Sequence, residues 1–450
     1  MLIAATYLAG AIFNVTSYGA IGDGVTNDSQ AFRDTFAAAC LAGPGNSVYA
    51  PAATYMLPRI NIQSAVYVEA CDGIEFYGDG VGETILKMQG GSHGGDYYML
   101  YFIISDDMVL RDFSCDGNRS EIIIADEQTH CIVETNCEDL LIHDVDLSHS
   151  YGDGIKLVGA NETNTRITIR DITTTDNGRS GIATHSGSDI LIERYTGSNI
   201  DQSCIDIEPG GGTGIDGFTL KDSTCVESRR GVTSMSFSGG TGEIGTPTSN
   251  VLIQNVVMYG CADSVQVDTI TFDNVQFYCP SGDALHFGRD ATNVTITRSA
   301  FSAEGGSAAI SFSADDEANN ITVSNVRLTV QDGVAFDIDG GAGNITLNNV
   351  RVFSQASFAQ GVGVQTNTRT DTPDMENLVF DIDVKRLRGG VAILRRSQFL
   401  ANVTSVELSG TITTRGGTDT FGISCANDAP LVLNDSEITI SANTPVSGCP

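Results

Sequence analysis

A short pattern of alternating apolar and polar residues returns along most of the chain. It reads apolar, any residue, apolar, any residue, then Asp, Asn or another polar residue, then apolar. Clear copies begin at Leu140, Ile167, Ile190, Phe218, Val251, Ile270, Val294, Ile321 and Ile345. With weaker copies near Met108, Leu378, Val406 and Leu431, the spacing averages roughly 27 residues, which lies in the range of solenoid repeats. Strict alternation predicts a short β-strand in each copy.

A second strand-like segment, usually opened by Gly or another small residue, lies between the copies. Examples are GDGIKLVG from Gly152, RSGIATHSG from Arg179 and QSCIDIEPGGG from Gln202. One unit cannot bury its own apolar face, whereas stacked units bury a continuous column of Ile, Val, Leu and Phe. Hairpin proteins show tight turns every 8–12 residues, a spacing absent here. The pattern therefore predicts a coiled β-solenoid, and we expect the Asn residues of several copies to stack as an internal ladder.

The segment Asn27–Leu41 predicts the one clear helix. Phe32, Phe36 and Cys40 share an apolar face, and the Gly-Pro-Gly turn from Gly43 ends the helix. Such a helix can cap the apolar end of a solenoid. The expected organisation is an N-terminal segment with cap helix (1–45), a β-helix (46–360) and irregular C-terminal coils that continue the solenoid (361–450).

The charge and hydrophobic content of the chain limit the classes of partner that it can bind. The 450 residues include 56 Asp and Glu against 24 Lys and Arg, a net charge of −32, with 41% hydrophobic residues. A protein this acidic is repelled by the phosphate backbone of DNA or RNA, so no nucleic-acid partner is expected. No apolar run reaches about 18 residues, so no membrane insertion is expected. The acid excess favours a saline, halophilic environment, because salt screens self-repulsion; an ordinary acidic, cation-binding secreted protein is the alternative.

Eleven Cys are many for a cytosolic protein and favour an extracellular or particle-surface location. Connectivity does not follow from sequence, and an odd count leaves at least one Cys unpaired within the chain. Candidate pairs are Cys40 with Cys71, Cys131 with Cys137, Cys261 with Cys279, and Cys425 with Cys449. The N-terminus lacks the basic region of a signal peptide. We expect either that a leader has been removed or that the chain is a virion component.

The stretch FNVTSYGAIGDGVTNDSQAFRDTFAAA, from Phe13 to Ala39, resembles the pectate-lyase-3-like right-handed parallel β-helix superfamily. That group includes glycoside hydrolases, polysaccharide lyases, polyuronate epimerases and phage tailspike depolymerases. The element Tyr-Gly-Ala-x-Gly-Asp-Gly-x-x-x-Asp is specific for the fold and not for a reaction. The resemblance implies an all-β, single-stranded right-handed parallel β-helix with an N-terminal cap helix. It also implies a polysaccharide ligand, acidic or bacterial, along the side of the helix.

Strand alternation gathers polar residues on one face of adjacent coils. Lys156, Ala183, Asp206 and Thr233 should form one outward column, and Val158, His185, Glu208 and Met235 the next. Tyr151, Asp153, Arg179, Arg229 and Arg230 lie just before these strands. The candidate catalytic residues are Asp206, Glu208, His185, Arg179, Lys156, Asp153 and Tyr151. Arg229, Arg230, Tyr97, Tyr98 and Tyr101 are candidates for binding a sugar chain.

Three interpretations of this face stay open. Asp206 and Glu208 have a spacing compatible with an inverting glycosidase, with His185 sharing a proton. Alternatively, as in the family's lyases, Asp153, Asp206 and Glu208 bind Ca²⁺ and neutralise a uronate. Arg179, Lys156 or His185 then abstracts the C5 proton, and Tyr151 protonates the leaving oxygen. In the third interpretation the face is a solvated ladder of ion pairs.

The chain departs from known members of the superfamily. The full motif set of polygalacturonase-like hydrolases and the Asp-Pro-His-Glu of mannuronan epimerases are both absent. Neither mechanism can therefore be carried over intact. The expected function is binding and cleavage of a polysaccharide by a lyase or hydrolase. The alternative is a non-catalytic glycan- or receptor-binding tailspike or adhesin, a homotrimer if viral.

Overall fold

The chain folds into two compact units of stacked β-strands, described by a computed structural model. Unit 1 comprises Met1–Arg229 with Gly242–Thr246, and unit 2 comprises Arg230–Thr241 with Pro247–Pro450. The structure describes residues 10–60, 63–92, 95–124, 127–159, 164–209, 214–228, 235–237, 248–312, 318–331, 333–339, 342–354, 361–368, 376–387, 390–397, 406–414, 420–425, 438–441 and 444–447. The expected limits at residues 45 and 360 stay predictions.

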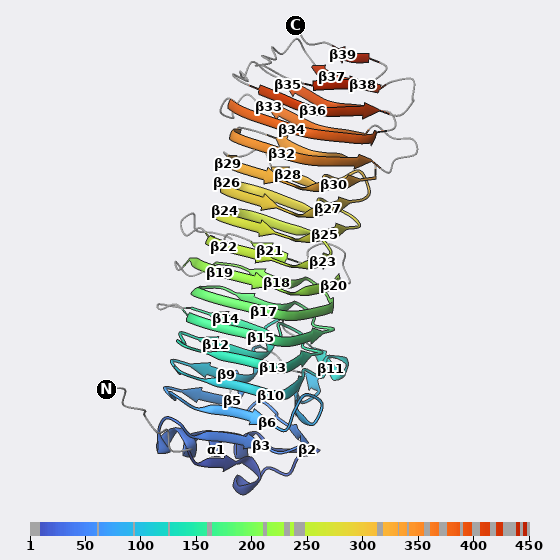
Figure 1. Cartoon of the computed structure of the whole chain (residues 1–450). Coiled ribbons are helices and arrows are strands. Elements are labelled where there is room, and N and C mark those ends of the chain that lie inside the picture. The colour runs from blue at the N-terminus through green and yellow to red at the C-terminus, as the bar shows by residue number, and fades with distance from the viewer. Residues whose placement is uncertain are drawn as a thin grey trace, which may run out of the picture. The chain divides into compact units, whose positions relative to one another are not determined.

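Unit 1 is built from short parallel strands, each paired with a strand one coil later (Figure 1). Its strands are β1 (Ile12–Asn14), β2 (Asp23–Asn27), β3 (Ser47–Ala50), β4 (Ala53–Met56), β5 (Ser64–Glu69), β6 (Glu75–Gly78), β7 (Thr84–Lys87), β8 (Gly91–Ser92), β9 (Tyr97–Ile103), β10 (Val109–Asp116), β11 (Ile122–Ile124), β12 (Thr129–Thr135), β13 (Leu141–Ser148), β14 (Ile155–Val158), β15 (Thr165–Thr175), β16 (Ser180–Thr184), β17 (Gly187–Ile200), β18 (Ser203–Ile207), β19 (Ile215–Lys221) and β20 (Thr224–Ser228). Two 3₁₀ turns, η1 (Val15–Tyr18) and η2 (Arg119–Glu121), lie between strands.

Parallel register stacks like residues above one another inside unit 1. Ile132, Ile155, Ile182 and Ile205 occupy one column of β12, β14, β16 and β18. All four side chains are at most 1% exposed, so they form a continuous apolar core. This arrangement confirms the predicted right-handed parallel β-helix.

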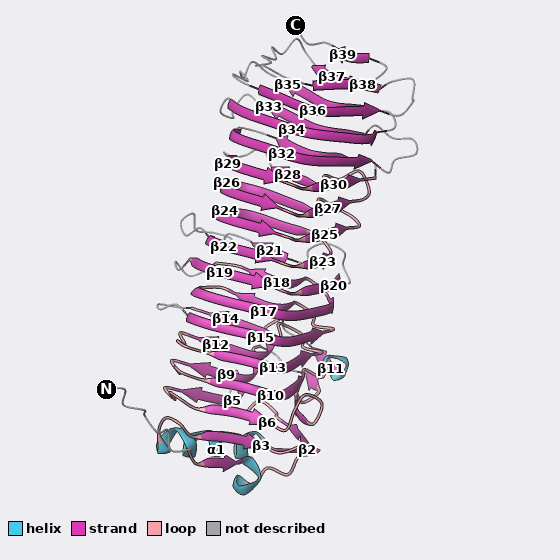
Figure 2. Cartoon of the chain, in the orientation of Figure 1, coloured by secondary structure: helices cyan, strands magenta, loops and turns pink. Residues whose placement is uncertain are grey.

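Unit 2 repeats the same construction, and strands make up most of its described residues (Figure 2). Its strands are β21 (Met235–Phe237), β22 (Thr248–Gln254), β23 (Val257–Tyr259), β24 (Ala262–Asp273), β25 (Gln276–Cys279), β26 (Leu285–Thr297), β27 (Ala300–Ala303), β28 (Ile310–Phe312), β29 (Ala318–Ser324), β30 (Arg327–Val330), β31 (Val334–Asp339), β32 (Ala342–Ser354), β33 (Gly361–Thr368), β34 (Glu376–Leu387), β35 (Gly390–Ser397), β36 (Val406–Thr414), β37 (Thr420–Cys425), β38 (Ile438–Ser441) and β39 (Thr444–Ser447). Stacked Phe287 and Phe312, with ring centroids 4.7 Å apart, lie in its core.

The cap helix α1 (Ser29–Ala42) is confirmed and begins two residues later than predicted. Phe32 and Phe36 are buried, and the Phe36 ring lies 5.6 Å from that of Phe76. Asp28, the last residue of the Tyr-Gly-Ala-x-Gly-Asp-Gly-x-x-x-Asp element, does not cap the helix with its side chain. Its carboxylate instead accepts the backbone N–H groups of Ile21 at 2.7 Å and Gly22 at 3.2 Å. The element therefore fixes the turn that leads into α1.

The polar position of the repeat marks a sharp corner of each coil. Every clear copy has a left-handed backbone there, at Asp144, Asp171, Arg194, Asp222, Asn255, Asn274, Arg298, Asn325 and Asn349. Asp and Asn tolerate this conformation better than most residues, which explains their recurrence. The Asn ladder exists, because Asn274 Nδ2 donates to Asn255 Oδ1 at 2.8 Å. Both residues are exposed, so the expectation of an internal ladder is wrong: the corner turns these side chains outward.

A substitution at one corner tests this backbone requirement. We expect Asn274→Val to lower the free energy of unfolding by about 1–2 kcal/mol relative to Asn274→Gly, since a β-branched residue is strained at a φ of 54°. Both variants lose the bond to Asn255, so their difference isolates the backbone. Urea unfolding followed by circular dichroism measures it. Equal stability of the two variants would contradict the explanation.

Disulfides confirm two of the candidate pairs and correct a third. Cys40–Cys71 and Cys261–Cys279 are bonded. Cys131 pairs with Cys115 and not with Cys137, because Cys115 in β10 faces it within one coil. Cys204 and Cys225 form a further bond. Cys137 is a buried free thiol. Cys449 lies outside the described residues, so its pairing with Cys425 stays a prediction.

Within the described part of the chain, no helix is both long enough and apolar enough to cross a membrane.

Candidate functional site

Three neighbouring strands of unit 1 place the predicted polar column. The register pairs Lys156 of β14 with Ala183 of β16, and Ala183 with Asp206 of β18. The inward residues between them are buried, as the alternation predicts. Thr233 lies outside the described residues, and the side chain of Met235 is likewise not described.

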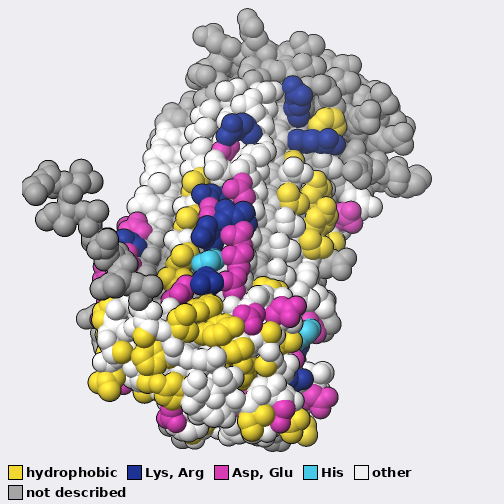
Figure 3. Space-filling view, turned by 60° about the horizontal axis from the view of Figure 1, so that its bottom comes forward, with side chains coloured by type: hydrophobic (Ala, Val, Ile, Leu, Met, Phe, Trp, Pro, Cys, Tyr) yellow, Lys and Arg dark blue, Asp and Glu magenta, His cyan; other side chains and the backbone are white. Residues whose placement is uncertain are grey.

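The outward column is covered rather than open. Lys156 is 8% exposed and Asp206 is 4% exposed, whereas the side chains of His185 and Glu208 keep 24% and 32% of their surface. Charged and His side chains gather in one stripe on a face of the molecule (Figure 3). The side chains of His185 and Glu208 are therefore the most exposed of this group, although the Nε2 atom of His185 is itself covered.

Arg179 is the centre of this cluster. Its NH1 donates to Asp153 Oδ2 at 3.1 Å, its NH2 donates to Glu208 Oε2, and the same NH2 lies 3.8 Å from Asp206 Oδ2. The guanidinium thus takes the position that the Ca²⁺ alternative assigned to a metal. Among the described residues, no group of three or more His, Cys, Asp or Glu is arranged to hold a metal ion.

The same contacts argue against the inverting-hydrolase hypothesis. Asp206 Oδ2 and Glu208 Oε2 both face one nitrogen of Arg179. An inverting pair stands about 6.5–9.5 Å apart with a water between the carboxyl groups. Here one guanidinium contacts both carboxyl groups, an arrangement typical of an ion-pair network, and the inverting pair stays a prediction.

Burial shifts the proton equilibria of the two inner carboxyl groups. The pKa of Asp206 is raised to about 7, mainly by burial and then by the neighbouring charges of Glu208 and Asp153. The pKa of Asp153 is raised to about 6, because burial outweighs the attraction of Arg179 and Lys156. Near neutral pH both groups therefore exchange protons, which is typical of functional sites and also of buried ion-pair networks.

The shifted pKa of Asp206 makes stability depend on pH. A folded-state pKa of about 7, above the ordinary 3.8, means that the folded protein holds this proton more tightly than the unfolded chain. The stabilising contribution is complete below the unfolded pKa and is lost as the pH rises through the folded one. We expect Asp206→Asn to reduce the fall in Tm between about pH 5 and about pH 8. Thermal unfolding across this range checks it, and an unchanged slope would contradict it.

His185 is held neutral beside two cations. Burial, followed by the charges of Lys156 and Arg179, lowers the pKa of His185 to about 4. Its Nε2 is buried, makes no hydrogen bond and lies 3.7 Å from Glu208 Oε2. A neutral imidazole with an unbonded nitrogen is a proton acceptor close to a carboxylate that can stabilise its charged form.

Lys156 differs from Arg179 in its partners. Its Nζ donates to the neutral Oε1 of Gln128 at 2.6 Å. Within the described residues it forms no ion pair, whereas Arg179 contacts three carboxylates. Burial lowers the pKa of Lys156. Lys156 is therefore the cation of the cluster that retains capacity for an incoming anion.

His130 belongs to the cluster, although the sequence did not indicate it. Its Nδ1 accepts the backbone N–H of Asp153 at 2.9 Å, and its Nε2 lies 3.2 Å from Gln128 Oε1. The ring is fully buried, and burial together with Lys156 lowers the pKa of His130 well below its usual range. The repeat is irregular in this coil, so the sequence does not show which residue of the next coil lies beside His130. Only the pairing of β12 with β14 shows this.

The tyrosines predicted to stack on sugars divide into two groups. Tyr97 is fully buried and donates its hydroxyl to the Leu57 carbonyl, so its expected sugar contact is wrong: it is a core residue. Tyr98 and Tyr101 are partly exposed, with ring centroids 5.2 Å apart. The Tyr98 ring also lies 5.5 Å from that of His130. These two aromatic rings therefore border the cluster at its N-terminal side.

Tyr151 lies in a neighbouring group of residues. The guanidinium of Arg119 lies 5.6 Å from the centre of its ring, and Arg119 also binds Asp201. No described contact joins the Tyr151 side chain to His185 or Glu208, so its predicted role as an acid stays a prediction. Arg229 and Arg230 lie outside the described residues.

Asp153 joins two neighbouring coils, whether or not it also takes part in a reaction. Its Oδ1 accepts the backbone N–H of Ser180 on the next coil at 2.9 Å. In unit 2, Asp283 of the similar Gly-Asp segment accepts the Ala308 N–H at 2.7 Å in the same way. Because this bond recurs away from the cluster, one oxygen of Asp153 serves to join coils.

A family model described as rhamnogalacturonase A/epimerase, pectate lyase-like, matches residues 12–278, more than half of the chain. The chain belongs to this family. This rhamnogalacturonase/epimerase family is carbohydrate-active and acts on polysaccharides, and the match confirms the resemblance drawn from the sequence. The matched range includes the whole cluster around Arg179.

Curated relatives of this family member include two mannuronan C5-epimerases of Azotobacter vinelandii. AlgE1 is 28% identical over 199 residues, which are 43% of this chain and 14% of AlgE1. AlgE4 is 28% identical over 195 residues, which are 42% of this chain and 34% of AlgE4. The chain thus matches about a third or less of the length of these two relatives.

Solved structures confirm the fold alone. The N-terminal fragment of bacteriophage Phi29 gene product 12 gives a TM-score of 0.52 at 16% identity, covering 96% of this chain and 71% of that one. The tailspike of E. coli bacteriophage HK620, solved with a pentasaccharide, gives 0.51 at 10% identity, covering 88% and 76%.

Proposed function

We propose that unit 1 binds a uronate-containing polysaccharide and removes the proton at C5 of a uronate unit. This step is common to polysaccharide lyases and C5-epimerases. The observation that carries the proposal is the neutral His185, with its unbonded Nε2, beside the cations Lys156 and Arg179. The epimerase relatives, 28% identical, support the same substrate class.

Each cation has a separate task in the proposed step. The ammonium of Lys156, bound only to neutral Gln128 among its described partners, neutralises the uronate carboxylate. Neutralisation lowers the cost of the negative charge that develops on the carboxylate when the C5–H bond breaks. Arg179 holds Glu208 and Asp153 in place and adds positive potential.

The proton moves from C5 to His185 Nε2, and the C5–H electron pair is delocalised into the carboxylate. Glu208, 3.7 Å from Nε2, stabilises the imidazolium that results. In a lyase the electrons then form a C4–C5 double bond, the C4–O bond breaks, and the leaving oxygen takes a proton. In an epimerase a proton is returned to C5 from the opposite face.

A non-catalytic role is the second candidate, supported by a specific observation. Arg179 is saturated by three carboxylates, and Asp153 and Asp206 are almost fully buried. Such a network can simply join three coils. The chain would then be a glycan-binding spike or adhesin, and the predicted trimer belongs to this alternative.

A panel of polymers distinguishes these functions. Polymannuronate, polygalacturonate and neutral dextran are incubated with the full chain, and the products are examined for 232-nm absorbance, new reducing ends and changed uronate composition. Unsaturated ends or epimerised units support proton removal. Reducing ends alone would show a hydrolase, and binding without any product would show the non-catalytic alternative.

We also propose that the chain works outside the cell or on a virion. The four disulfides of the described residues support this location, because such bonds persist in oxidising surroundings. The saline environment stays a prediction.

A further inference from the structure

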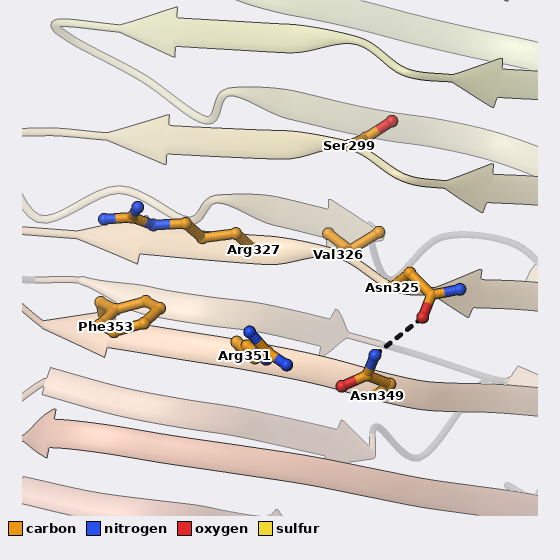
Figure 4. A pocket seen from close by; sticks show the side chains of 7 residues that line it. All are labelled: Ser299, Asn325, Val326, Arg327, Asn349, Arg351 and Phe353. Carbon is orange, nitrogen blue, oxygen red and sulfur yellow. Dashed lines mark hydrogen bonds between the residues drawn. The ribbon is translucent and has the colours of Figure 1, made fainter.

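Unit 2 has a groove lined by residues of β30 and β32 and by residues just before β27 and β30 (Figure 4). Its volume is about 340 Å³, and it is lined by Ser299, Asn325, Val326, Arg327, Asn349, Arg351 and Phe353. The two arginines and the two asparagines are exposed. The groove therefore presents guanidinium and amide donors next to one aromatic ring.

The two arginines form a matched pair. The register places Arg327 of β30 directly beside Arg351 of β32, one rung apart, at about 4.8 Å between strands. Neither makes an ion pair among the residues that the structure describes. Elsewhere the guanidinium groups of Arg194 and Arg298 bind Asp171 and Asp273. Two adjacent, uncompensated cations are unexpected in a chain with a net charge of −32.

Phe353 orients one of these cations. The Arg327 guanidinium lies over its ring, 4.6 Å from the centroid. A stacking contact of this kind uses the face of the guanidinium and leaves the N–H donors at its edge available. Arg327 is thus held ready to bind a planar carboxylate with two parallel hydrogen bonds.

The column of stacked residues that contains Phe353, called the strip below, also holds two exposed aromatic rings three and four rungs away. The register aligns Tyr259, Tyr278, Ser302, Thr329 and Phe353 in one column. Tyr259 and Tyr278 are 48% and 40% exposed and stack with their ring centroids 5.2 Å apart. Flat exposed aromatic rings are suited to the apolar faces of sugar rings. The short side chains of Ser302 and Thr329 lie between these tyrosines and Phe353 in the column.

We infer that this strip of unit 2 binds an acidic, carboxylated saccharide. Arg327 and Arg351 hold uronate carboxylates, and the aromatic rings contact the sugar faces. The choice of a uronate polymer rests on the proposed function of unit 1, whereas the anion preference rests on the arginine pair alone. On a chain this acidic, such a patch provides the local positive potential that a polyanion requires.

The test compares variants of the full chain in which Arg or Lys residues are replaced by Ala. Binding of polymannuronate is measured by affinity electrophoresis, with neutral dextran as the second probe, for Arg327→Ala/Arg351→Ala, Arg298→Ala and Lys156→Ala. We expect the double variant to weaken polymannuronate binding by roughly tenfold or more, because charge-assisted bonds are lost. Arg298→Ala, whose guanidinium is already paired, should change it less than about twofold.

The outcomes separate this inference from the function of unit 1. Weaker binding by the double variant, with turnover of short oligouronates unchanged, supports a second binding site. Unchanged binding by the double variant, with loss on Lys156→Ala, would overturn the inference and leave the unit 1 proposal standing. Equal loss on neutral dextran would overturn the anion preference. Retained binding by every variant would contradict both proposals.

Discussion

Arg179→Ala is expected to lower the free energy of unfolding of unit 1 by about 3–5 kcal/mol, because removing one partner of a buried ion pair leaves uncompensated charge. Asp153 and Asp206 would remain buried at 0% and 4% exposure without the cation that now contacts them. The same change removes a hydrogen bond to Glu208. Urea unfolding near neutral pH measures the loss.

Arg194→Ala is the matched control for this substitution. Arg194 also binds a carboxylate, Asp171, but on the exposed surface, where solvent screens the pair. Little or no change is expected there. Adding Asp206→Asn to the Arg179→Ala variant should restore part of the lost stability, because one buried charge is then removed. If Arg179→Ala were no more destabilising than Arg194→Ala, the central position of Arg179 would be refuted.

His185→Asn is expected to reduce turnover of a polyuronate by about 10²–10⁴-fold, the usual contribution of a general base. The reason is that the Nε2 proposed to accept the C5 proton is lost, while the size and polarity of the side chain are roughly kept. Binding of the polymer should change little, since Lys156 and Arg179 remain. Initial rates and KM for polymannuronate give both quantities.

His286→Asn provides the control for that experiment. His286 is a partly exposed residue of unit 2 whose Nδ1 bonds Ser311 at 2.7 Å, and it has no part in the proposed step. Its replacement should leave the rate unchanged. Equal rates for the wild type and His185→Asn would rule out His185 as the base and would direct attention to Glu208 or Lys156.

The stacking of coils can be predicted from the sequence because each coil of a solenoid repeats the same short pattern of inward and outward residues. A side-chain period of two places Ile155 inward and Lys156 outward, and the repeat length then aligns Lys156 with Asp206. The outward column can thus be predicted from the sequence alone. The Asp or Asn of most copies is visible in the sequence too, but only the left-handed corner shows that its side chain points to solvent.

The chemistry of the cluster could not be predicted in the same way. Alternation gives the face of a residue but not the reach of its side chain, so nothing in the sequence showed that Arg179 would bridge Asp153, Asp206 and Glu208. The repeat does not indicate His130, because the coil of His130 departs from it. Tyr97 was misassigned for a related reason: in a cluster of aromatic residues, the register with Thr129 and not composition decides which ring is buried.

One measurement tests the central claim most directly: proton NMR of polymannuronate incubated with the chain in D₂O. The proposal predicts that the C5–H signal disappears, because a lyase removes this hydrogen and an epimerase replaces it with deuterium. His185→Asn should slow the loss and His286→Asn should not. An intact C5–H signal, whether new reducing ends form or the polymer is merely bound, would contradict proton removal by the cluster around Arg179.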